Sequence, residues 1–310
     1  MRNLENNMTG QVRPGAGTFV RLRRALVGLA LVAGATVALG SAAVPASAVP
    51  NVRELSGLSA FNSTGLKSLN VVCPPFYHAV GGSAYIQGDD PGQVRIIAAV
   101  PNGADTSGSA YSILASEQEA GTGGNWRIVG TAVCAPAASL PGLEYQNANS
   151  AFNSAATNGA TATCSAGKRL IGLGAEAWYS SLSDRSQVVL TGFRPDAAGT
   201  AVTATGFEDE TGFSGNWRVH ATAVCVSPVP GQQPVAQIVG YNSDPVKVAA
   251  PQCPTGTRVH SLGFDLSATA GQAHVHQLFI GGQAGSIRAV EDANGLTGSW
   301  RLRGYAICAN

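Results

Sequence analysis

The segment Glu117–Cys134 reads EQEAGTGGNWRIVGTAVC, and related segments recur at Glu208–Cys225 and Glu291–Cys308. Aligned without gaps, the three copies share Glu, two Gly, Trp, Arg, Ala and Cys at identical offsets. In each copy two runs flank a short Gly-rich stretch, which is the pattern of a β-hairpin with a loop longer than two residues. The second run alternates with a period of two. On the face that begins with Trp126, the side chains become smaller along the strand, from Trp to small residues. We therefore expect a strand whose Trp-bearing face is buried.

The shared Trp, Glu and Arg are interpreted as residues that maintain the fold. Removing a buried Trp would cost roughly 3–5 kcal/mol. The Glu and the Arg are predicted to form a cross-strand ion pair, worth roughly 0–1 kcal/mol where exposed. A catalytic acid with its partner is the alternative, but no second carboxylate recurs beside it, as glycoside hydrolysis would require. The nine residues are Trp126, Trp217 and Trp300; Glu117, Glu208 and Glu291; and Arg127, Arg218 and Arg301.

The first 48 residues have the pattern of a signal peptide. Three arginines (Arg21, Arg23 and Arg24) precede an apolar run over residues 25–39, and a small-residue cleavage site follows at 46–48. A membrane anchor is the alternative, but the apolar run is short and contains glycines. Without this segment 14 Lys and Arg face 17 Asp and Glu, a net charge near −3. This balance indicates no nucleic-acid or anionic-membrane partner, and we expect a secreted protein with no membrane span after processing.

The remainder divides into three units of similar pattern, at 49–135, 136–226 and 227–310. Each unit opens with an aromatic-Asn-Ser triplet, followed eleven residues after the Asn by a Cys and then by a pair of small residues. Each closes with the hairpin and a second Cys. Repetition at this period indicates three copies of one structural element. The triplets begin at Phe61, Phe152 and Tyr241.

Six cysteines in an exported chain indicate disulfides. The repetition leaves two schemes. Within units, the bridges are Cys73–Cys134, Cys164–Cys225 and Cys253–Cys308, and this scheme is favoured because it makes each unit self-sufficient. Between units, the bridges are Cys134–Cys164, Cys225–Cys253 and Cys73–Cys308.

Short apolar runs bounded by Gly, Pro, Asn and Asp predict about five strands in each unit, and no segment has a helical period. Pro-rich joints separate the units at 135–140 and 227–234. Few charges and abundant Gly, Ala, Ser, Thr and Val are typical of an extracellular β protein. We therefore expect an all-β fold of three homologous antiparallel units.

Four features of each unit together resemble a known repeat. They are the Asn-Ser strand, the Cys followed by Pro or Ser, the pair of small residues, and the Trp with Ala-Val-Cys or Ala-Ile-Cys. This repeat belongs to uncharacterised secreted actinobacterial β-repeat proteins and also occurs behind collagen-like stretches. The resemblance covers almost all of 52–310; Cys253–Arg258 and Gly304–Cys308 are nearest to it, whereas Cys73–Phe76 lacks the Gly. It implies no established activity. Because the repeat follows triple helices, it implies units that trimerise and hence a pseudo-threefold, β-prism-like arrangement; three tandem β beads on the Pro-rich joints are the alternative.

Trp178 and Tyr179 occur only in the second unit, in a run that is expected to be a loop. An aromatic pair in a loop can stack on a sugar ring, so these residues are the candidate ligand-binding site. The alternative is a loop anchor that packs over the sheet.

His274 and His276 are two residues apart and could chelate a metal if a third ligand such as His260 joined them. A polar strand face is the plainer interpretation, so we expect no metal and no cofactor. No Gly-x-Ser-x-Gly, His-Glu-x-x-His or phosphate-binding Gly-Lys-Ser/Thr motif is present. The sequence favours a non-catalytic extracellular module that binds a glycan or another cell-surface component, or acts structurally. The alternative is a secreted hydrolase with its site near Trp178 or His274.

Overall fold

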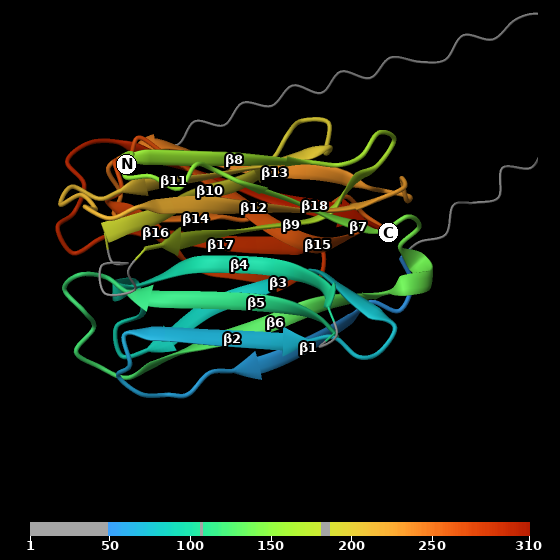
Figure 1. Cartoon of the computed structure of the whole chain (residues 1–310), viewed down its shortest axis with the longest axis horizontal. Helices are drawn as coiled ribbons and strands as arrows, with labels where there is room; N and C mark the ends of the chain where they lie inside the picture. Colours follow the sequence, from blue (N-terminus) through green and yellow to red (C-terminus); the bar gives the residue numbers. More distant parts are fainter. Residues whose placement is uncertain (1–48, 106–107, 181–186) are drawn as a thin grey trace, which may run out of the picture. The chain divides into compact units, whose positions relative to one another are not determined.

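A computed structural model describes residues 49–105, 108–180 and 187–310, so the predicted signal peptide lies outside the described residues. Within these ranges the chain is all-β: the structure has 18 strands, two short 3-10 helices and no α-helix (Figure 1). The 3-10 helices are η1 (Pro91–Gln93) and η2 (Ala137–Ser139). The predicted fold class is therefore confirmed.

The strands fall six to a unit. Unit one contributes β1 (Arg53–Leu58), β2 (Leu66–Val72), β3 (Tyr77–Gly88), β4 (Val94–Asp105), β5 (Gly108–Glu117) and β6 (Trp126–Pro136). Unit two contributes β7 (Glu144–Asn149), β8 (Thr157–Thr163), β9 (Arg169–Tyr179), β10 (Val188–Pro195), β11 (Ala201–Glu208) and β12 (Trp217–Val226). Unit three contributes β13 (Gln233–Asn242), β14 (Val246–Ala249), β15 (Arg258–Ser267), β16 (Ala273–Gly281), β17 (Ala284–Glu291) and β18 (Trp300–Ala309).

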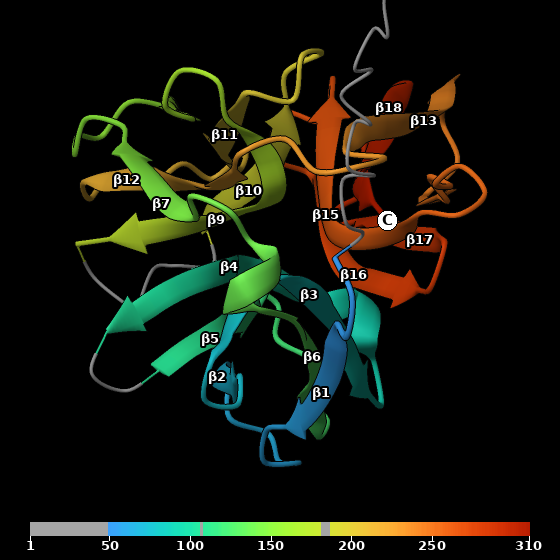
Figure 2. The same cartoon turned by 90° about the vertical axis from the view of Figure 1, so that its right-hand side faces the viewer.

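Each of the three six-stranded antiparallel sheets joins three strands of one unit to three strands of another. The first sheet has the order β1-β6-β3-β16-β17-β14, the second β2-β5-β4-β9-β12-β7, and the third β13-β18-β15-β10-β11-β8. Units one and three share the first sheet, units one and two the second, and units two and three the third, so the sharing closes into a cycle. Figure 2 shows the strands of the three units as three sectors of this body. Tandem beads with separate sheets are therefore ruled out, whereas the pseudo-threefold symmetry stays a prediction. The predicted β-hairpins are wrong, because the two strands that flank each Gly-rich stretch lie in different sheets: β5 and β6, β11 and β12, and β17 and β18.

The pairing between units is short. Strands β3 and β16 pair at only two positions, Gln277↔Tyr85 and Leu278↔Ala84, and the junctions β4–β9 and β10–β15 also have two pairs each. Within unit one, by contrast, β3 and β6 pair at eleven positions. Side-chain packing between the sheets must therefore contribute most of what holds the units together.

Small residues let the inner strands β3, β9 and β15 approach one another closely. A Cβ atom at Gly172 would lie 1.6 Å from the carbonyl oxygen of Val80, and one at Gly81 would lie 2.3 Å from that of His260. The equivalent residue of unit three is Ser261, whose hydroxyl donates to a main-chain carbonyl of unit two at 3.1 Å. Each of these contacts joins a different pair of units. The small residues seen after the first Cys of each unit are thus explained by close backbone approach.

All six cysteines form disulfides within units. The bridges are Cys73–Cys134, Cys164–Cys225 and Cys253–Cys308, with Cα–Cα distances of 5.7, 5.7 and 5.6 Å. The within-unit scheme is confirmed, and the between-unit scheme is wrong. The argument that favoured it holds only in part, because every unit depends on the others to complete its sheets.

Candidate functional site

Each recurring Trp is fully buried and donates its indole N–H to the Glu that precedes it by nine residues. The pairs are Trp126–Glu117, Trp217–Glu208 and Trp300–Glu291, with N···O distances of 2.7, 2.9 and 2.9 Å. A buried indole N–H without an acceptor is costly, so this hydrogen bond explains why the Glu recurs with the Trp. The predicted Glu–Arg ion pair is wrong, since none of the ion pairs within 49–105, 108–180 and 187–310 joins these residues.

The recurring Arg instead lies over the ring that opens the aromatic-Asn-Ser triplet of its own unit. The distances from the guanidinium carbon to the ring centroid are 5.7 Å for Arg127 over Phe61, 5.9 Å for Arg218 over Phe152 and 5.1 Å for Arg301 over Tyr241. These distances are in the range of cation–π contacts. The three rings stay 52, 49 and 56% exposed. We call each pair an arginine–aromatic site and number the sites by unit.

A third residue faces the Arg from the neighbouring strand, and it differs in each unit. In site one Arg127 Nε donates to Gln87 Oε1 at 2.8 Å, and in site three Arg301 Nη2 donates to the hydroxyl of Ser267 at 3.0 Å. In site two the Arg lies over a second ring, that of Trp178, at 4.9 Å. The three residues occupy the same register position opposite the Arg. The sites therefore share a framework and differ in the group beside the ring.

Trp178 and Tyr179 end strand β9, opposite Arg218 and Trp217, and are not in a loop as predicted. Successive strand residues point to opposite faces, so the two rings cannot form one stacking platform. Trp178 is 47% exposed and belongs to site two. Tyr179 packs against the core and meets the ring of Phe213 edge-on, with 6.2 Å between centroids. The candidate ligand-binding pair is thereby separated, and only Trp178 keeps a face for a ligand.

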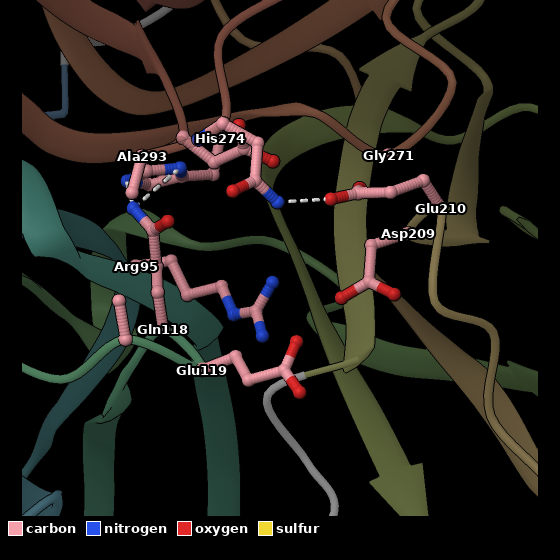
Figure 3. A pocket seen from close by; sticks show the side chains of 11 residues that line it. Arg95, Gln118, Glu119, Asp209, Glu210, Gly271, His274 and Ala293 are labelled. Carbon is pink, nitrogen blue, oxygen red and sulfur yellow. Dashed lines mark hydrogen bonds between the residues drawn. The ribbon is translucent and has the colours of Figure 1, made fainter.

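A polar pocket of about 220 Å³ lies where the residues after each recurring Glu come together. Unit one contributes Gln118 and Glu119, unit two Asp209 and Glu210, and unit three Asp292, Ala293 and Asn294. Arg95 on β4 and His274 on β16 lie deeper and are buried. Figure 3 shows the side chain of Arg95 directed between Glu119 and Asp209.

Burial dominates the electrostatics of this pocket. It lowers the pKa of Arg95, and nearby acidic groups, Asp209 among them, oppose that change. Burial also lowers the pKa of His274 well below its ordinary value, and Arg95 lowers it further. The pKa of Asp292 is raised to about 6, first by burial and then by Glu210. The pocket thus gathers carboxylates around a buried guanidinium.

The histidines do not form the metal site that the sequence analysis considered as an alternative. His274 and His276 are 2 and 7% exposed, so they are not on a polar strand face, and the register of β16 shifts between Val275 and Gln277. His274 Nε2 donates to the carbonyl oxygen of Gly92 at 3.1 Å, and the side-chain amide of Gln118 is 3.4 Å from His274 Nδ1. In the described part of the chain, no group of three or more His, Cys, Asp or Glu side chains could hold a metal ion.

The sequence reasoning did not assign a site to the triplet rings, although it used the triplets to define the units. A usable signal was present: Phe61 and Phe152 each precede their Arg by 66 residues, and Tyr241 precedes its Arg by 60. The difference equals the shortening of the third unit between its two cysteines, from 61 to 55 residues. The constant spacing shows that the ring and the Arg recur together in every unit, although it does not by itself place them in contact.

Disulfides at all six cysteines fit an oxidising, extracellular environment. Over the described ranges, no helix has the length and apolar character needed to cross a membrane. No protein-family model matches the chain, and neither does any curated protein.

Proposed function

We propose that the mature protein is a secreted, non-catalytic module that binds carbohydrate through its three arginine–aromatic sites. The observation that carries the proposal is the threefold occurrence of a half-exposed ring beside the same Arg. These rings lie outside the core, whose stability already rests on the buried Trp residues and the disulfides. A half-exposed ring that recurs beside the same Arg in every unit offers a ligand three equivalent contact surfaces.

The chemistry of the sites suits a sugar. A pyranose ring stacks on an aromatic face through its C–H groups, while its hydroxyls require hydrogen-bonding groups at the rim. The Arg supplies donors, and Gln87 in site one and Ser267 in site three add an amide and a hydroxyl. Beside Phe61 and Arg127 the surface is hollowed by about 280 Å³.

Site two is expected to bind most tightly. Two rings, Phe152 and Trp178, flank Arg218 there, so a sugar gains a larger aromatic surface than in the other sites. Sites that are weak one by one become effective together when the ligand is a polymer with repeated sugars. We therefore expect retention on a polysaccharide to be much stronger than binding of a monosaccharide.

The test is retention of the mature protein on a panel of insoluble polysaccharides and cell-wall preparations. The triple variant Phe61→Ala, Phe152→Ala, Tyr241→Ala should lose retention, with an unchanged far-ultraviolet circular dichroism spectrum. Phe279→Ala is the matched control, because Phe279 is 45% exposed and has no recurring Arg beside it. Retention of the triple variant at the wild-type level, or no retention of the wild type on any glycan, would overturn the proposal.

Secretion is tested separately, by expressing the full chain in a Gram-positive host. We expect the protein in the culture medium with an N-terminus at Val49, after cleavage behind Ala48. A cell-bound protein that keeps its first 48 residues would contradict this part of the proposal.

A further inference from the structure

A groove of about 500 Å³ opens on the third sheet, on the face of β18 that also carries Arg301 of site three. It lies between the end of β10 with its following turn and the adjacent strands β13 and β18. Its apolar wall comes from Pro195, Ala197, Pro234, Val235 and Ala236, and its polar groups are Arg194, Asp196, Arg303 and Tyr305.

The corresponding place in the second sheet is filled by a side chain of the protein itself. Tyr145 on β7 and Pro234 on β13 hold the same register position, each opposite the residue before the closing Cys. The ring of Tyr145 packs against the end of β4, where a Cβ atom at Gly103 would come within 3.0 Å of it. Its hydroxyl donates to the carbonyl oxygen of Ala79 at 2.9 Å. Pro234 is shorter, and its ring lies beside the turn after β10, where a Cβ atom at Gly199 would come within 3.1 Å of it. The carbonyl oxygen of Leu170, which is equivalent to that of Ala79, accepts instead from the side-chain amide of Gln232 at 3.0 Å. The groove opens between Pro234 and the end of β10.

The charges of the groove are also particular to the third sheet. At the positions of Arg194 and Arg303 the second sheet has Val100 and His220. Arg194 forms an ion pair with Asp265 at 2.9 Å, whereas Arg303 lies over the ring of Tyr305 at 5.0 Å. The Nε atom of Arg303 is buried and has no hydrogen-bond partner in the described part of the chain.

The one carboxylate that lines the groove does not oppose an anion strongly. Asp196 accepts hydrogen bonds from the main-chain N–H groups of Thr200 and Ala201 and from the Thr200 hydroxyl. These bonds point its oxygens at its own turn. The groove therefore combines proline rings, against which an aromatic ring can pack, with guanidinium groups that can receive a carboxylate.

We propose that this groove is a second binding site, which takes a small aryl carboxylate. The aromatic ring lies between Pro195 and Pro234, where the second sheet places Tyr145, and the carboxylate meets Arg303. A ligand of this size should bind with a dissociation constant of about 0.1–1 mM.

The probe is 4-hydroxyphenylacetate, titrated into the mature, oxidised protein and followed by isothermal calorimetry and by ligand-observed NMR. The neutral p-cresol isolates the contribution of the ring, and glucuronate isolates that of a carboxylate on a sugar. We expect saturable binding of 4-hydroxyphenylacetate, binding of p-cresol about tenfold weaker or more, and none of glucuronate. Absence of saturable binding, or binding of glucuronate as tight as that of the aryl acid, would overturn the proposal.

Two pairs of variants assign the binding to the groove. Pro234→Tyr should place a ring where Tyr145 lies in the second sheet and abolish binding, whereas Pro234→Ala should keep it. Arg303→Gln should weaken binding about tenfold or more, whereas Arg288→Gln removes an exposed Arg outside the groove and should have no effect. Thermal unfolding of every variant verifies the fold, and unchanged binding by a folded Pro234→Tyr protein would refute the assignment.

Discussion

Replacing the recurring Glu by Leu tests how much the buried Trp depends on its acceptor. The second and third units differ in one respect that ranks the outcome. Trp217 Nε1 bonds Glu208 alone among the described residues, while Trp300 Nε1 also lies 3.0 Å from the carbonyl oxygen of Asp244. Removing the carboxylate therefore leaves one indole N–H without a partner and the other with one.

An unpaired buried donor costs about 1–3 kcal/mol, and hydrogen bonds to charged groups lie at the upper end of that range. Glu208→Leu should therefore lower the free energy of unfolding by about 3 kcal/mol. Glu291→Leu should lower the free energy of unfolding by about 1 kcal/mol. This figure includes the loss of the hydrogen bond that the main-chain N–H of Leu296 donates to Glu291. For a chain of this size the first change corresponds to a fall in Tm of about 6–12 °C and the second to about 2–4 °C.

The measurement is equilibrium unfolding in guanidinium chloride at pH 7 with the disulfides intact, followed by Trp fluorescence and by circular dichroism. Glu208→Gln and Glu291→Gln are the controls, because each keeps an oxygen acceptor at nearly the same place and should cost less than its Leu counterpart. The reasoning is refuted if Glu291→Leu destabilises the protein as much as Glu208→Leu, or if the Gln variants lose as much as the Leu variants.

Three further changes have outcomes fixed by the structure. Burial, with Arg258, lowers the pKa of His260 to about 4. The wild type should therefore lose up to about 3 kcal/mol of stability as the pH falls from about 6.5 to 4. Denaturation of His260→Val, compared at pH 7 and pH 4.5, should show a smaller loss. Burial and Glu210 raise the pKa of Asp292 to about 6, so stability is lost as the pH rises through that value. Asp292→Asn should therefore raise the free energy of unfolding by about 1 kcal/mol at pH 8 and leave it unchanged at pH 4. The figure of about 1 kcal/mol is discounted for solvent screening. Replacing Cys164 and Cys225 together by Ala removes a bridge between residues with a sequence separation of 61 and should cost about 4 kcal/mol in thermal or chemical unfolding. An unchanged Tm would contradict the chain-entropy account.

The features that repeat could be predicted from the sequence, because three copies restrict the choices. The recurrence of two cysteines in every unit reduced the pairings to two schemes, and the structure has the within-unit scheme that was favoured. The period of two after Trp126 predicted its buried face, and the Trp is fully buried. Both inferences stay within one unit: a disulfide joins its two cysteines, and the alternation along a single strand fixes which residues face inward.

Those patterns do not predict contacts between segments that are distant in the sequence. The Glu was paired with the Arg because both are charged, although Glu117 on β5 accepts a hydrogen bond from the indole of Trp126 on β6, a strand of a different sheet. The exchange of strands between units rests on two residue pairs at each junction, such as Leu278↔Ala84, which leave no periodic signal. Trp178 was assigned to a loop because polar residues follow it, but β9 continues through Tyr179 and pairs with β12.

The cyclic sharing of sheets also explains why the candidate sites are not all alike. In an assembly of three identical chains, each substitution would appear in every copy of a site. In one continuous chain each unit can change alone while the others keep the shared sheets intact. The position that carries Tyr145 in one sheet and Pro234 in another, and the position that carries Gln87, Trp178 or Ser267 beside the Arg, have changed in this way. The groove on the third sheet accordingly has no copy in the second sheet, where Tyr145 stands at the position of Pro234.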